Sequence, residues 1–200
     1  CMKKSHVAGI IVVVILLIAV GILMNGKKYS PTGQYLDKTF KGGTDAEVII
    51  IEYSDFQCPA CKAASGISDA LVEKYGDKVK FVYKNFPLRS IHPQAQKAAE
   101  AAECVKDLGG DYWAYHDILF DNQNALYPAN LKIYARQTGV DGDQFDACLD
   151  SGAMQGIVES DYQEGLQKSV RATPTFFIGT QRAEGANQQA VFNAVDRQLE

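Results

Sequence analysis

Two cysteines separated by two residues stand where an apolar strand gives way to a helix. The segment Cys58-Pro59-Ala60-Cys61 follows the apolar run 48–53 and opens a stretch with helical spacing. Unpaired N–H groups and the positive dipole at a helix N-terminus favour a thiolate over a thiol. Cys58, nearer the helix start, is therefore the candidate nucleophile, and Cys61 is placed to close a disulfide with it. The pair predicts a dithiol that exchanges disulfides.

Half of a zinc site is the rival interpretation of a C-x-x-C pair. Zinc needs two further Cys or His ligands at short spacing. Cys104 and Cys148 lie far apart in the sequence, and His92 and His116 fall in different expected elements. We therefore predict no metal, and we give no role to Cys1, which precedes Met2.

The expected elements begin with a strand, a helix and a second strand. Residues 61–75 have helical spacing and end at Gly76, and residues 78–86 alternate as a strand does. The two strands should therefore be parallel and joined by a crossover helix. Because the run 48–53 is almost uniformly apolar, it predicts a central strand covered on both faces.

The second half of the chain is a helical block followed by a hairpin and a last helix. The expected helices cover residues 94–106, 112–120, 128–138, 143–150 and 153–170. Residues 175–178 and 182–184 predict the hairpin, and residues 187–199 predict a helix that begins with an Asn cap.

An uncharged apolar segment, residues 7–24, follows a short flank at 1–6. As a helix it would approach the roughly 30 Å of bilayer hydrocarbon, and it exceeds the about 7–15 apolar residues of a cleavable signal peptide. We therefore expect an uncleaved transmembrane anchor, with cleavage near residues 19–21 as the alternative. Residues 25–45 are polar and glycine-containing, as a linker would be.

The chain has a net charge of −4 with no basic patch, which argues against a nucleic-acid partner.

A second motif, Ala172-Thr173-Pro174-Thr175, leads into the apolar strand of the hairpin. A proline cannot donate to a strand ladder, so Pro174 should lie at a turn or an exposed position. The order of elements, the C-P-x-C motif and this T-P-T segment together resemble the thioredoxin superfamily, specifically its DsbA-like branch, over about residues 46–200. The resemblance implies an α/β thioredoxin-like fold with a helical insertion at about 93–170.

The resemblance also assigns roles. It makes Cys58 the attacking thiol and Cys61 the resolving one, and it implies a cis Thr173–Pro174 bond with Thr173 presenting its backbone to an extended substrate. Glu52 lies inside the apolar strand, where a carboxylate is costly unless paired or neutral. In related proteins an acid at this position handles the proton of the resolving thiol. The alternative is an edge-exposed Glu52 without a role.

The other cysteines and the aromatic helix have structural interpretations. In an oxidising compartment, Cys104 and Cys148 should form a structural disulfide, and two buried free thiols are the alternative. Trp113, His116 and Phe120 share one helical face, which predicts packing rather than catalysis by His116.

These observations predict a membrane-anchored, extracytoplasmic thiol:disulfide oxidoreductase that needs no cofactor and forms disulfides in exported proteins. The linker is too short for a dimerisation module, which favours a monomer. The resemblance implies a DsbB-like or VKOR-like membrane redox partner. Strongly oxidising relatives carry His where this chain has Ala60, so we expect a potential below the roughly −120 mV of DsbA. A reductase for particular clients and a redox-inert, tethered peptide-binding or chaperone module are the alternatives.

Overall fold

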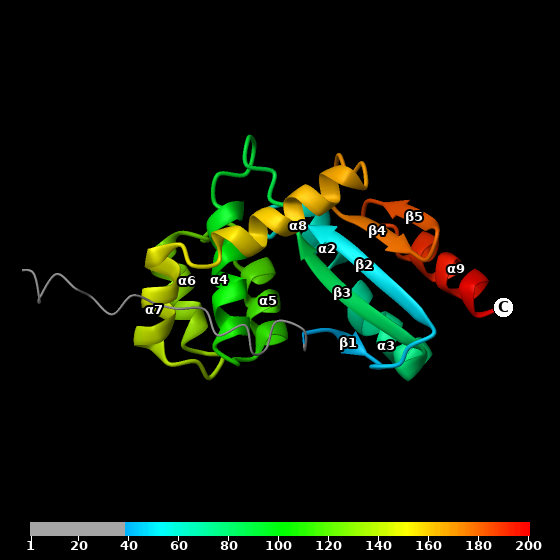
Figure 1. The fold of residues 1–200 in the computed structure, drawn as a ribbon, viewed down its shortest axis with the longest axis horizontal. Coiled ribbons are helices and arrows are strands. Elements are labelled where there is room, and N and C mark those ends of the chain that lie inside the picture. The colour runs from blue at the N-terminus through cyan, green and yellow to red at the C-terminus, as the bar shows by residue number, and fades with distance from the viewer. Residues whose placement is uncertain (1–38) are drawn as a thin grey trace, which may run out of the picture.

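A five-stranded sheet organises residues 39–200, the part of the chain that the computed structural model describes (Figure 1). The central strand β2 (Val48–Ser54) runs parallel to β3 (Val79–Asn85) and antiparallel to β4 (Thr175–Ile178). Strand β5 (Gln181–Glu184) lies at one edge and β1 (Lys41–Gly42) at the other, so the order is β1-β3-β2-β4-β5. The predicted parallel unit and returning hairpin are confirmed.

Strand β1 was not predicted, and it places residues 41–42 in the sheet rather than in the linker to which we assigned 25–45. The strand pairs antiparallel with β3. The strand is too short to have a detectable periodicity, but the structure explains why residue 42 is a glycine. Gly42 has φ +93°, and a Cβ there would lie 2.0 Å from the Val79 carbonyl oxygen. Only glycine allows this close approach of the two backbones.

The single helix expected over residues 61–75 is in fact two helices. Helix α2 (Pro59–Ala64) ends where the Ser65 N–H and hydroxyl both bond the Lys62 carbonyl oxygen, at 3.2 and 2.9 Å. Helix α3 (Ile67–Tyr75) then starts after Gly66 and leads through the 3-10 turn η2 (Gly76–Lys78) into β3. The local bonds of Ser65 replace the hydrogen bonds of a continuous helix, and the periodicity of the sequence does not reveal this break.

The helical block is confirmed, with small differences at its helix ends. Its helices are α4 (Ala95–Asp107), α5 (Tyr112–Asp121), α6 (Pro128–Ala135), α7 (Gly142–Ser151) and α8 (Gln155–Gln167), and α9 (Gln188–Leu199) closes the chain. The helix predicted to reach residue 138 stops at 135, because the N–H groups of Gln137 and Thr138 bond carbonyls three residues back. Such tighter turns commonly end helices.

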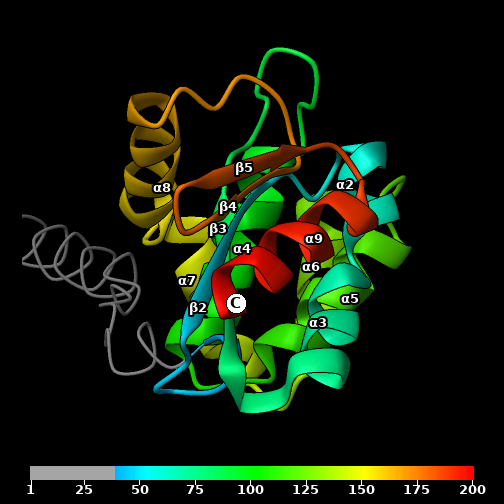
Figure 2. The same ribbon diagram turned by 90° about the vertical axis from the view of Figure 1, so that its right-hand side faces the viewer.

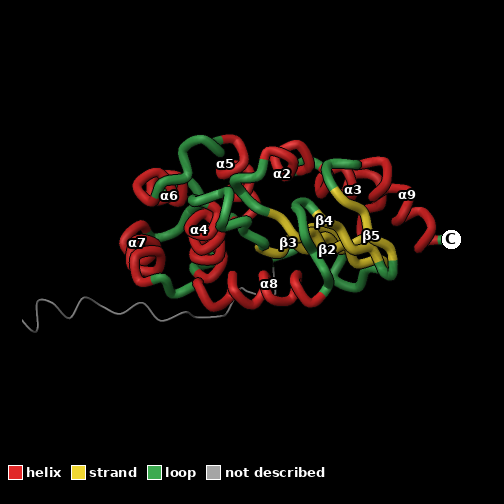
Figure 3. The backbone as a smooth tube through the Cα atoms, turned by 90° about the horizontal axis from the view of Figure 1, so that it is seen from above, coloured by secondary structure: helices red, strands yellow, loops and turns green. Residues whose placement is uncertain are grey.

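The sheet lies between two helical layers. Helices α2, α3 and α9 cover one face and α8 covers part of the other, while α4 to α7 form a block at one end of the sheet (Figures 2 and 3). Helix α8 packs over the buried rings of Tyr53 and Phe86. It leaves Ile49, at the opposite end of β2, 52% exposed. The expectation that β2 is covered along both faces was therefore wrong at that end.

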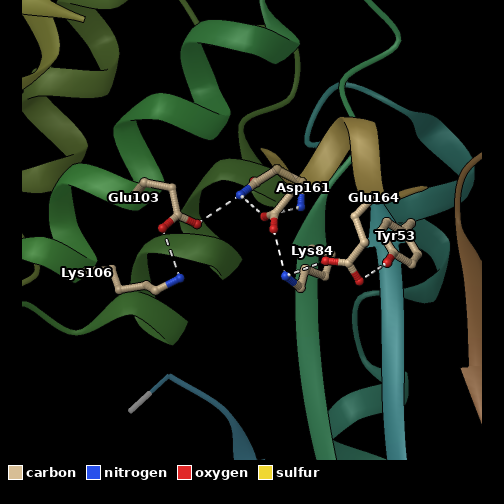
Figure 4. Close-up of polar contacts among 7 residues, drawn as sticks. Tyr53, Lys84, Glu103, Lys106, Asp161 and Glu164 are labelled. Atoms are coloured by element: carbon tan, nitrogen blue, oxygen red, sulfur yellow. Dashed lines mark hydrogen bonds and ion pairs between the residues drawn. The ribbon is translucent and has the colours of Figure 1, made fainter. Parts of the chain in front are cut away.

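A network of charged and polar side chains joins the helical block to the sheet (Figure 4). Asp161 of α8 accepts the Asn85 backbone N–H at 3.1 Å and pairs with Lys84 at 2.8 Å. The Asn85 side chain also donates to Glu103 of α4 at 2.8 Å, and Lys84 lies 3.2 Å from Glu164. Because losing one partner would leave another charge buried and unpaired, the network fixes the block against the end of β3.

The expected flank, anchor and most of the linker, at 1–6, 7–24 and 25–38, lie outside the described residues. Among residues 39–200, no helix combines the length and apolar character needed to cross a membrane.

Candidate active site

The two cysteines of the C-P-A-C segment lie at the start of α2. Cys58 caps the helix with extended backbone angles, φ −78° and ψ 123°, and Pro59 occupies the first turn. The Cys58 N–H donates to the Asp55 carbonyl at 3.0 Å, so a tight turn leads from β2 into the helix. Cys58 is 7% exposed and Cys61 is fully buried. Both thiols are free, so the structure describes the reduced pair.

The surroundings of Cys58 favour its thiolate. The pKa of Cys58 is lowered to about 5, chiefly by a hydrogen bond from the Cys61 thiol. Burial acts against this shift, while Thr173 and the backbone N–H groups of Ala60 and Cys61 add to it. These N–H groups belong to the first turn of α2, so the helix start contributes as the sequence predicted.

Cys61 is perturbed in the opposite direction. Burial raises its pKa above the ordinary value, and the hydrogen bond with Cys58 and the charge of Glu52 raise it further. The Asp55 N–H also lies 3.4 Å from Cys61 Sγ. One thiol of the pair therefore ionises easily, while its neighbour retains its proton.

Glu52 lies on the face of β2 that the active-site helix covers. Side chains alternate along a strand, so Glu52 shares this face with the core residues Val48 and Ile50. It is 2% exposed, and burial raises its pKa to about 8. The alternative of an edge-exposed Glu52 is therefore wrong. The carboxyl can exchange a proton near neutral pH, close enough to Cys61 for its charge to affect that thiol.

The Thr173–Pro174 segment lies beside Cys58, although 115 residues separate Cys58 and Thr173 in the chain. The peptide bond between Thr173 and Pro174 is cis. The Thr173 carbonyl oxygen is 3.5 Å from Cys58 Sγ, and the Pro174 carbonyl accepts the Gly185 N–H at 2.9 Å. The segment is therefore held in place by the turn after β5 while the Thr173 carbonyl faces the Cys58 sulfur.

Cys104 and Cys148 are joined by a disulfide that connects α4 to α7, with a Cα–Cα distance of 6.0 Å. Both residues are fully buried. The bond lies within the helical block and braces it.

Sequence reasoning missed the role of three residues, Asp55, His92 and Gln123, that hold the turn before α2. The Asp55 carboxylate accepts the Gln57 and Leu88 N–H groups, each at 2.7 Å, and pairs with His92 Nδ1 at 2.9 Å. Gln123, after α5, donates from Nε2 to the Phe56 and Cys58 carbonyls at 2.8 and 2.9 Å. Asp55 could have been found as a polar residue just before Cys58. Gln123 had no local signal, because it is 65 residues from Cys58.

His116 packs within the core, as its helical face predicted. Its ring centroid lies 4.8 Å from that of Phe120 and 5.8 Å from that of Phe56, and burial lowers its pKa. Within residues 39–200, no three His, Cys, Asp or Glu side chains gather as a metal site would require.

Comparison with known proteins gives a family and a fold. A family model described as thioredoxin matches residues 36–196. Among curated proteins, the chain is 37% identical over 156 residues to Na(+)/H(+) antiporter NhaA 3 of Salinispora tropica. That match covers 78% of this chain and 24% of the antiporter, so the chain spans about a quarter of this relative.

Two solved structures share the fold over most of both chains. Oxidised BdbD of Bacillus subtilis is 24% identical with a TM-score of 0.71, and the match covers 86% of this chain and 96% of BdbD. The thiol-disulfide exchange protein alpha-DsbA2 of Wolbachia pipientis is 20% identical with a TM-score of 0.69, covering 85% and 95%. The predicted DsbA-like arrangement, with helices inserted into a thioredoxin-like sheet, is thereby confirmed.

Proposed function

The chain belongs to the thioredoxin family, and on that premise we propose that it is a DsbA-like thiol:disulfide oxidoreductase whose reacting pair is Cys58 and Cys61. The observation that carries the proposal is the opposite perturbation of these neighbouring thiols, one pKa lowered and the other raised. A thiol with a low pKa attacks readily as a thiolate and leaves readily from a mixed disulfide. The second thiol keeps its proton until the first is engaged.

In the oxidising direction, the reaction starts from the Cys58–Cys61 disulfide. A substrate thiolate attacks Cys58 Sγ, the bond between the two enzyme sulfurs breaks, and Cys61 leaves with the electron pair. Cys61 takes up a proton, which we assign to the Glu52 carboxylic acid. A second substrate thiolate then attacks the substrate sulfur of the mixed disulfide and expels Cys58 as a thiolate. Two electrons pass from substrate to enzyme, which ends with Cys58 as a thiolate, Cys61 as a thiol and Glu52 as a carboxylate.

Thr173 and Pro174 supply the main-chain groups beside this reaction. We assign to Thr173 the docking of an extended substrate segment through backbone hydrogen bonds, as in other cases of strand addition. Its carbonyl lies 3.5 Å from Cys58 Sγ, so a segment docked there would have its own sulfur within reach.

The direction of exchange depends on how far the Cys58 thiolate is stabilised. Its pKa of about 5 falls between the about 3.5 of DsbA and the about 7 of thioredoxin. A reduction potential between roughly −120 and −270 mV is therefore expected, which supports a weaker oxidant than DsbA and leaves a reductase as the alternative. Ala60→His should raise the potential, measured by equilibration with glutathione. A wild-type value at or above about −120 mV would contradict this reasoning.

We assign the enzyme to the outside of the cytoplasmic membrane, anchored through residues 7–24 and acting as a monomer. The Cys104–Cys148 disulfide supports this placement, because such bonds persist in oxidising compartments. Its substrates would be reduced exported proteins, and a DsbB-like or VKOR-like membrane protein would reoxidise it. We do not extend ion antiport to this chain, because the match covers only 24% of the antiporter.

The test is catalysis of disulfide exchange by the purified protein. We expect it to oxidise reduced, unfolded ribonuclease or to reduce insulin, and Cys61→Ser to accumulate a mixed disulfide through Cys58. Cys58→Ser is the matched control and should trap nothing. Failure of both reactions and of trapping would favour the redox-inert binding module instead.

A further inference from the structure

A pocket of about 340 Å³ opens beside Pro59, the residue next to the nucleophilic cysteine. Three segments that are distant in the sequence form its walls: the turn before α2, the loop before α4 and the connection between α5 and α6. Thr173 contacts Cys58 from a different segment, the one before β4. Cys58 therefore has the cis-proline segment as one neighbour and this pocket, through Pro59, as another.

The walls of the pocket are fixed by hydrogen bonds that leave other polar groups unused. Gln57 accepts the Gln94 N–H at 2.8 Å through its amide oxygen, and His92 pairs with Asp55 through Nδ1. These bonds leave the Gln57 amide nitrogen and His92 Nε2 without a partner among residues 39–200. The Asn124 amide and the Tyr127 hydroxyl, in the α5–α6 connection, also make no hydrogen bond within that part of the chain, and Tyr127 is 57% exposed.

The chemistry of these groups indicates the ligand. No Asp, Glu, Lys or Arg among the described residues lines the pocket, so it offers no carboxylate for a metal, and its histidine, His92, is already paired with the Asp55 carboxylate. The amide groups of Gln57 and Asn124 and the Tyr127 hydroxyl are uncharged donors and acceptors beside the apolar side chains of Pro59 and Leu126. Peptide amides and small uncharged polar side chains match such a surface, because each can satisfy both donors and acceptors.

We propose that this pocket is a second substrate subsite, which binds an uncharged, hydrogen-bonding segment of the polypeptide next to its reacting cysteine. The proposal rests on the proposed function. The cis-proline segment would dock the substrate backbone, and the helical insertion would select the neighbouring residues. Asn124 and Tyr127 are then residues that determine specificity without touching the reacting sulfurs.

The test compares peptide and small-molecule disulfides as substrates of the full chain. The peptide probe carries one cysteine flanked by Ser and Asn and activated as a mixed disulfide with thionitrobenzoate. The small probe is hydroxyethyl disulfide. The variants are Asn124→Ala and Tyr127→Phe, which remove groups without internal partners. Asn193→Ala on α9 is the control for a change at an exposed side chain, although Asn193 accepts one hydrogen bond from Gln189. Asn193 is exposed and far from the pocket in the sequence.

For the peptide, we expect each pocket variant to raise KM by about 3- to 10-fold with kcat unchanged, the size of one lost hydrogen bond. The rate with hydroxyethyl disulfide, the reduction potential and the Asn193→Ala kinetics should not change. An unchanged peptide KM would overturn the proposal, and so would equal losses with both probes, which would indicate a disturbed active site. A loss with hydroxyethyl disulfide but not with the peptide would make the pocket a small-thiol site and also refute the proposal. If the wild type reacted with neither probe, the proposed function itself would fail.

Discussion

Replacing Glu52 with Gln should make the protein more stable at neutral pH, not less. The Glu52 carboxyl has a pKa of about 8 in the folded state, against 4.5 without burial. The unfolded chain therefore releases this proton at lower pH than the folded chain, so wild-type stability falls as pH rises from 4.5 to 8. Each pKa unit corresponds to about 1.4 kcal/mol, so at pH 7 the penalty is about 3 kcal/mol. The amide in Glu52→Gln stays neutral at every pH and avoids this penalty.

Urea unfolding between pH 4.5 and pH 8 measures this difference. Both proteins carry Cys58→Ser and Cys61→Ser, which removes thiol titration and leaves the Cys104–Cys148 disulfide intact. We expect the free energy of unfolding of Glu52→Gln to exceed that of its parent by an amount that grows with pH and levels near pH 8. Glu47→Gln, at an exposed position one residue before β2, is the control and should show no such trend. Parallel pH curves for parent and Glu52→Gln would refute both the elevated pKa and the proton-carrier role built on it.

Three further outcomes follow from the geometry. The ultraviolet absorbance of the Cys58 thiolate should titrate near pH 5 in the reduced protein. In Cys61→Ala, which lacks the main hydrogen bond that stabilises this thiolate, the midpoint should lie at higher pH. A wild-type midpoint near the ordinary value of 9 would contradict this. Removing the Cys104–Cys148 disulfide with two alanines should lower the free energy of unfolding by about 4 kcal/mol for its separation of 44 residues, as measured in urea. A loss below about 1 kcal/mol would reject the bracing role. Gln123→Ala should lower the free energy of unfolding by about 1–3 kcal/mol through its two lost hydrogen bonds. Gln123→Glu should not restore it, because a carboxylate cannot donate; full recovery would show that the bonds do not matter.

The elements with strong periodicity were predictable, and the exceptions have local causes. The apolar run 48–53 became β2, and the five helices of the block appear where their spacing put them. Strand β1 is two residues long and forms only by pairing with β3, so no pattern within its own sequence could predict it. The break between α2 and α3 depends on the hydrogen bond from the Ser65 hydroxyl to the Lys62 carbonyl. This local bond competes with the helix, although the apolar periodicity of the sequence continues through Ser65.

The sequence by itself determined the Cys58–Cys61 pair proposed to react, its place at a helix start and the proline that accompanies it. These features are local, because a cap, a dipole and a missing N–H act within a few residues. Only the tertiary structure decided which groups surround those two thiols. The Thr173 carbonyl, the charge of Glu52 and the amide of Gln123 reach Cys58 and Cys61 from separate segments. Burial in the packed core, which raises the pKa of Cys61 and of Glu52, likewise exists only once the sheet and helices have packed.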